Sequence, residues 1–130
     1  MLTENSTFEA FANAAKQKRV IGFGVGRSLS EAINTLSKHG HNIEYVVDND
    51  FWKWGKEHCG IRICSPSILT KEDFENIVVL ICIDAIFDIE KQLIDMGITE
   101  YYAYSLWVDK IYEQSSRTVL INYSGKEISL

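Results

Sequence analysis

Continuous apolar runs that recur along the chain constrain its fold more than any other feature. Val20-Ile21-Gly22-Phe23 and the run from Ile77 to Ile83 lack the polar alternation of a half-buried strand. Such runs are typical of strands that are covered on both faces. Apolar stretches at 43–47, 61–64 and 98–104 predict three further strands.

The segments between these runs carry helix signals. Ser6-Thr7-Phe8-Glu9 and Ser28-Leu29-Ser30-Glu31 have capping-box spacing, Ser65-Pro66 opens a third helix, and Asp84 is placed to cap a fourth that ends at Gly97. Strands that alternate with helices are typical of a parallel sheet with right-handed crossovers. The sequence therefore predicts an α/β fold, a three-layer Rossmann-like domain with a mainly parallel sheet.

The length of 130 residues predicts a single domain over 1–130. Its core is expected at about 19–104, with an N-terminal helix within 1–18 and a C-terminal helix and strand within 105–130. A hydrophobic content of 46% is that of a globular chain with a well-formed core. Because the scaffold uses most of this length, the sequence favours a binding module over a complete enzyme, either as a free-standing protein or as an excised piece.

Charge and cysteine content narrow the classes of partner. Thirteen basic against 18 acidic residues give 13 − 18 = −5, which argues against nucleic acid as a partner. No apolar run approaches the ~20 residues of a membrane helix, and no secretory leader is evident, so we expect a cytoplasmic protein without a membrane span. The three cysteines have no zinc-site spacing, and no metal is expected.

A glycine-rich turn follows the first predicted strand and precedes a helix. The segment Gly22-Phe23-Gly24-Val25-Gly26-Arg27-Ser28 stands where the helix N-terminus of a doubly wound sheet offers N–H donors to an anion. Gly22, Gly24 and Gly26 allow close backbone approach to a phosphate, and Arg27 and Ser28 open the helix. The third glycine of the dinucleotide fingerprint is missing, which disfavours NAD(P), whereas the Arg27 guanidinium suits a phosphate.

Polar and aromatic residues at the ends of other strands complete the candidate site. Asp48, 22 residues beyond Gly26, stands where an acid accepts from ribose hydroxyls, and Asn49 follows it. Trp52, or Trp54 beside it, is suited to stacking on a base or sugar. Asp84, with Asp88, is expected at the mouth of the same crevice.

Two alternatives without a ligand stay open for these residues. In the first, Gly24 and Gly26 only make a tight turn and Asp48 only ends a strand. In the second, one tryptophan packs under its loop while the other marks a contact between subunits. Neither alternative is decided by the sequence.

Several of these segments together resemble a family. They are Val20 to Gly24, Tyr45 to Asp50, Gly60 to Pro66, Val78 to Ile83 and Gln92 to Ile98. They look like the small Rossmann-like, nucleotide-sugar-binding or CoA-binding-like domains of bacterial sugar and surface-polysaccharide biosynthesis proteins. The resemblance implies a nucleotide, nucleotide-sugar or similar phosphorylated small molecule bound at Gly22, Gly24 and Asp48, and a fusion to a transferase domain in many relatives.

The sequence thus predicts a nucleotide- or nucleotide-sugar-binding module that serves bacterial polysaccharide or sugar biosynthesis. One alternative is a non-catalytic interaction or scaffold domain, able to form homo-oligomers, that uses Phe51, Trp52 and Trp54. A second is a minimal NAD(P)-dependent oxidoreductase, which needs a general acid such as a buried tyrosine. No catalytic residue can be chosen from the sequence.

Overall fold

A computed structural model describes residues 7–107 of the chain. Within this range the strands form a six-stranded sheet of order β3-β4-β2-β1-β5-β6. Their bounds are β1 (Arg19–Phe23), β2 (Ile43–Val47), β3 (Glu57–His58), β4 (Ile61–Cys64), β5 (Ile77–Ile81) and β6 (Tyr101–Ala103). The apolar runs of the sequence therefore did mark strands, although β5 ends before Ile83 and β6 begins after Ile98.

The predicted three-layer Rossmann-like domain with a mainly parallel sheet is wrong. The sheet is mixed, because β3 pairs antiparallel with β4 at one edge. The crossover from β4 to β5 holds two 3₁₀ helices, η2 (Pro66–Lys71) and η3 (Phe74–Asn76), where an α-helix was expected.

Local backbone features accompany both departures. Cys59 and Gly60 both have positive φ, +51° and +79°, and reverse the chain between β3 and β4 as a tight hairpin. In the crossover, Ser65 and Asp73 each accept from the backbone N–H two residues later, so short capped turns replace a continuous helix.

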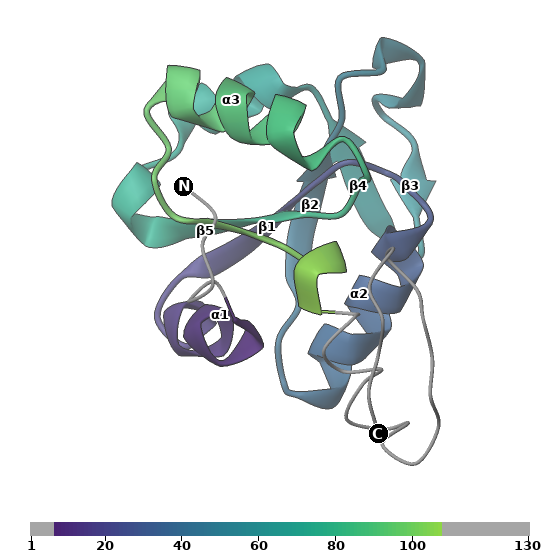
Figure 1. The fold of residues 1–130 in the computed structure, drawn as a ribbon. Coiled ribbons are helices and arrows are strands. Elements are labelled where there is room, and N and C mark those ends of the chain that lie inside the picture. Colours follow the sequence, from purple (N-terminus) through teal and green to yellow (C-terminus); the bar gives the residue numbers. More distant parts are fainter. Residues whose placement is uncertain (1–6, 108–130) are drawn as a thin grey trace, which may run out of the picture.

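Three α-helices, among residues 7–107, pack on the sheet: α1 (Phe8–Ala15), α2 (Ser28–Lys38) and α3 (Ile86–Met96). In Figure 1, α1 and α2 lie on one side of the sheet and α3 on the other. Side chains of α1 and α2 pack with those of alternate strand residues such as Val20, Val78 and Leu80. Side chains of α3 and η2 pack with those of the intervening residues, among them Ile21 and Val79.

The residues that cap the helices differ in part from those predicted. Thr7 caps α1 by accepting from the Ala10 N–H at 3.2 Å, whereas Ser6 of the predicted capping box lies outside the described residues. Ser28 is not a cap: it is the first residue of α2, and its hydroxyl donates to the carbonyl of Cys82 at 2.9 Å. Asp84 does not cap α3 with its side chain; Ala85 holds the N-cap position, while Gly97 ends α3 in the predicted left-handed conformation.

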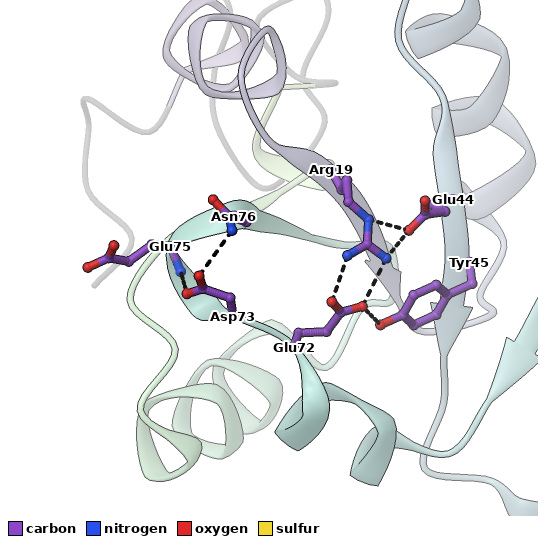
Figure 2. Close-up of polar contacts among 7 residues, drawn as sticks. All are labelled: Arg19, Glu44, Tyr45, Glu72, Asp73, Glu75 and Asn76. Carbon is purple, nitrogen blue, oxygen red and sulfur yellow. Dashed lines mark hydrogen bonds and ion pairs between the residues drawn. The ribbon is translucent and has the colours of Figure 1, made fainter.

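A polar network joins the crossover to the strands, as shown in Figure 2. The Arg19 guanidinium, on β1, binds the carboxylates of Glu44 on β2 and Glu72 after η2. The Tyr45 hydroxyl donates to Glu72 at 2.7 Å. Arg19 and Tyr45 lower the pKa of Glu72, and burial together with Glu72 raises the pKa of Tyr45.

The predicted C-terminal helix and strand fall largely on residues 108–130, which lie outside the described part of the chain. Trp107, at the end of the described range, is 3% exposed. Its ring contacts those of Phe8 and Phe11 on α1, so residues beyond β6 close the core against the N-terminal helix.

Candidate functional site

The carboxyl ends of β1, β2 and β5 meet at one edge of the sheet, called here the carboxyl edge. The glycine turn of residues 24–27 leaves β1 at this edge and enters α2. The Gly24 N–H donates to the carbonyl of Val47 at 2.7 Å, and the Cys82 N–H donates to that of Phe23 at 2.8 Å. These two bonds fasten the turn between β2 and the residues that follow β5.

Two glycines of the turn are required by close packing. Gly24 has φ +103°, and a Cβ there would lie 2.6 Å from the Cβ of Ile83. A Cβ on Gly26 would lie 3.0 Å from the carbonyl oxygen of Cys82. Gly22 lies within β1, where a Cβ would press on Val46 at 3.1 Å. Packing within the fold alone thus accounts for these three residues, which supports the alternative that the glycines only make a tight turn.

Asp48 lies beside the turn, as predicted, but it is buried at 5% exposure. Its Oδ2 accepts from the Val25 N–H at 2.7 Å, and its Oδ1 accepts from the Asp50 N–H at 2.8 Å. The Nζ of Lys53 lies 4.0 Å from the same Oδ2. The carboxylate therefore joins the glycine turn to the end of β2.

Asn49 forms a reciprocal amide pair with Gln92 on α3. The Asn49 Nδ2 donates to the Gln92 Oε1 at 2.9 Å, and the Gln92 Nε2 donates back at 3.0 Å. Both groups of the Asn49 amide are thus engaged with α3.

An exposed aromatic surface, formed by Phe51, Trp52 and Trp54, follows Asp50. Phe51 and Lys53 bound the 3₁₀ helix η1 (Phe51–Lys53), and Trp52 is 72% exposed. The Phe51 and Trp52 rings are in contact, with 4.6 Å between centroids and a tilt of 32° between their planes. Trp54 is held more firmly, because its Nε1 donates to the carbonyl of Asp48 at 2.6 Å.

Arg27 and Asp84 lie at the open side of the turn. The Arg27 side chain is 97% exposed, and its Nη2 lies 3.9 Å from Oδ2 of Asp84, which is itself 84% exposed. At this exposure the pair is weak, so the guanidinium is free to bind another anion. Asp88 is exposed in the first turn of α3.

The structure thus brings together the turn, Arg27, Asp48 and Asp84, and it places η1 next to them. Lys53 makes this connection: its Nζ donates to the carbonyl of Val25 at 3.4 Å. Sequence reasoning missed Lys53. Its position between two tryptophans directly after β2 was a signal, although only the fold shows where the side chain lies.

A second cluster was also missed. The Ser30 hydroxyl, in the first turns of α2, lies 2.7 Å from Nε2 of His58 and 3.9 Å from the Cys59 sulfur. The distant segments that carry these residues gave no common motif. Among the described residues, no group of three or more His, Cys, Asp or Glu side chains is arranged to hold a metal ion.

The three tyrosines near β6 bear on the oxidoreductase alternative. The hydroxyl of Tyr101 donates to Glu90, that of Tyr102 to Glu100, and that of Tyr104 is bonded to Thr35. Burial raises the pKa of Tyr101 to about 12. Burial likewise raises the pKa values of Tyr102 and Tyr104. These buried, bonded hydroxyls give the oxidoreductase alternative no support.

Comparison with known families assigns the chain to one of them. The family model described as C2185-like, N-terminal, matches residues 16–103, which include all six strands together with α2 and α3. The chain belongs to this family. A comparison with curated proteins gives no match. Across residues 7–107, the C2185-like domain has no helix with the length and apolar character to span a membrane.

Proposed function

We propose that this C2185-like domain binds a phosphorylated small molecule with a planar ring, of the nucleotide or nucleotide-sugar class, at the carboxyl edge. One observation carries the proposal: the Lys53 Nζ bond to the carbonyl of Val25 holds η1 against the glycine turn. An exposed guanidinium and an exposed indole thereby flank the same edge.

The phosphate end of the ligand is assigned to the start of α2. The first N–H groups of an α-helix have no partner within the helix and favour an anion. Arg27 directly precedes the helix, and its guanidinium can donate two parallel hydrogen bonds to phosphate oxygens. Asp84 is a weak competitor for Arg27 because both side chains are almost fully exposed.

The ring of the ligand is assigned to the Phe51–Trp52 pair. An aromatic side chain that is 72% exposed leaves one face available for stacking. Stacking of a base on an aromatic side chain is sequence-tolerant and contributes about 1–3 kcal/mol.

The role assigned is binding rather than catalysis. Service to sugar or surface-polysaccharide biosynthesis in a bacterial cytoplasm is part of the same proposal, and its support is the resemblance of the strand ends and loops described above. NAD(P) remains the less favoured ligand because Arg27, directly before α2, stands in place of the third glycine.

Titration calorimetry with ADP, CDP, UDP, UDP-sugars, NAD and acetyl-CoA tests the proposal. We expect at least one nucleotide to bind, with a loss of about tenfold or more in Arg27→Gln and in Trp52→Ala. Arg62→Gln and Ile94→Ala are control variants, since Arg62 on β4 and Ile94 near the end of α3 are exposed on other elements, and should bind as the unchanged protein does. No heat with any ligand refutes the proposal.

The aromatic surface itself favours a second candidate, a protein-interaction domain. Phe51 and Trp52 are 57% and 72% exposed, and large exposed aromatic side chains are typical of interfaces. If the domain forms an oligomer by sedimentation, loses it in Trp52→Ala and binds no nucleotide, this candidate replaces the first.

A further inference from the structure

We infer that the carboxyl edge does not read the ribose of its ligand, so that ribonucleotides and 2′-deoxyribonucleotides bind alike. This inference rests on the proposed function and narrows its ligand class to a phosphate and a planar ring. It reverses the role that the sequence predicted for Asp48.

The carboxylate of Asp48 is already committed to the protein. One oxygen accepts the Val25 N–H and the other the Asp50 N–H, at 2.7 and 2.8 Å. Each oxygen keeps a second lone pair, but the side chain is only 6% exposed. A ribose hydroxyl therefore cannot approach these lone pairs unless the β2 end moves, and that movement would break both bonds.

The next residues offer no substitute. The Asn49 amide is paired on both sides with Gln92 of α3. The Asp50 Oδ1 accepts the N–H of Trp52 and so fixes the start of η1. Asp50 and Asp84 are both exposed, so a test must check these two neighbouring carboxylates separately.

Asp48 is instead a positioning residue for the glycine turn. It fixes the Val25 amide, while Lys53 approaches both the Val25 carbonyl and the Asp48 carboxylate. These contacts set the position of the turn from which Arg27 and the first N–H groups of α2 extend. Removing the charge should weaken phosphate binding indirectly and equally for any sugar.

The test compares ADP, CDP and UDP with their 2′-deoxy forms by calorimetry, on the unchanged protein, Asp48→Asn, Asp50→Asn and Asp84→Asn. We expect the dissociation constants within each pair to agree within about threefold in all four proteins. We also expect Asp48→Asn to weaken both members of a pair by the same factor, and any change in affinity in Asp50→Asn, which caps η1, to be equal for both members. In nuclear magnetic resonance spectra without ligand, the Val25 and Asp50 amide signals should shift in Asp48→Asn, because one Asn oxygen cannot accept both bonds.

The outcomes separate the two proposals. A tenfold or greater preference for ribonucleotides, lost in Asp48→Asn, Asp50→Asn or Asp84→Asn, overturns the inference and leaves the proposed function intact. Binding of neither nucleotide series overturns both. Unmoved Val25 and Asp50 amide signals in Asp48→Asn overturn the positioning role, whatever the ligand result.

Discussion

Replacing Gly24 with alanine should destabilise the domain through two separable effects. The first is backbone strain, because φ at Gly24 is +103°, beyond the left-handed helical region near +57° that other residues occasionally adopt. The second is overpacking, because the new Cβ would lie 2.6 Å from both the Cβ and the Cγ2 of Ile83.

The expected magnitude follows from these two effects. A positive φ costs an L-residue about 1–2 kcal/mol. An extra carbon forced into packed surroundings costs about 1–3 kcal/mol more. Gly24→Ala should therefore lower the free energy of unfolding by about 2–5 kcal/mol, a shift of roughly 8–20 °C at about 4 °C per kcal/mol for a chain of this size.

Gly60→Ala is the matched control for the backbone effect. Gly60 has φ +79°, and a Cβ there meets nothing within 4 Å. This variant should lose only the backbone contribution of about 1–2 kcal/mol. A Gly24→Ala, Ile83→Ala double variant should recover part of the packing loss, since the substitution at 83 removes the contacted Cγ2 atom.

Urea unfolding at pH 7, monitored by circular dichroism, measures five proteins: the unchanged protein, Gly24→Ala, Gly60→Ala, Ile83→Ala and the double variant. The reasoning fails if Gly24→Ala is no less stable than Gly60→Ala, or if the two substitutions in the double variant are simply additive. In either case Ile83 would move aside at little cost, and close packing would not explain the glycine.

Two further predictions concern the network in Figure 2 and the thiols. Hydrogen bonds from Arg19 lower the pKa of Glu72 in the folded protein below the ordinary value of 4.5. The ionised Glu72 carboxylate therefore stabilises the folded state fully above pH 4.5, and this stabilisation is lost as the pH falls through the folded-state pKa. In urea unfolding, Glu72→Gln should therefore lower the free energy of unfolding at pH 7 and lower it progressively less below pH 4.5. The control Glu75→Gln, at a carboxylate that points away from the network, should leave the free energy of unfolding unchanged at pH 7. An equal loss in Glu72→Gln at pH 7 and pH 3 contradicts the prediction. Burial raises the pKa of Cys82 to about 12, whereas Cys59 is exposed. A disulfide reagent at pH 8 should therefore modify Cys59 in the folded protein and Cys82 only after unfolding. Rapid modification of Cys82 in the folded protein would contradict this prediction.

The sequence by itself determined where most elements lie. Apolar runs located β1, β2 and β4 almost to the residue, because most of their side chains are buried; the exposed Glu44 in β2 and Arg62 in β4 are single interruptions of these runs. The helical periodicity of 28–38 and the left-handed Gly97 were also readable, since both depend on interactions within a few residues.

The overall architecture was not readable in the same way. The β3–β4 hairpin needs a left-handed Cys59, a conformation that the residue type does not suggest. The crossover after β4 carries a serine cap and a proline that suit an α-helix equally well, and only its packing against the sheet decides for 3₁₀ turns.

The tertiary structure also decided what the site residues do. Asp48 and Val25 are bonded across 23 positions, and Arg19 and Glu72 across 53. Spacing along the chain placed Asp48 beside the glycine turn but could not show that its oxygens already accept two backbone amides. Local signals encode secondary structure, whereas the partner of a buried polar group depends on which distant segment the sheet brings within hydrogen-bond distance.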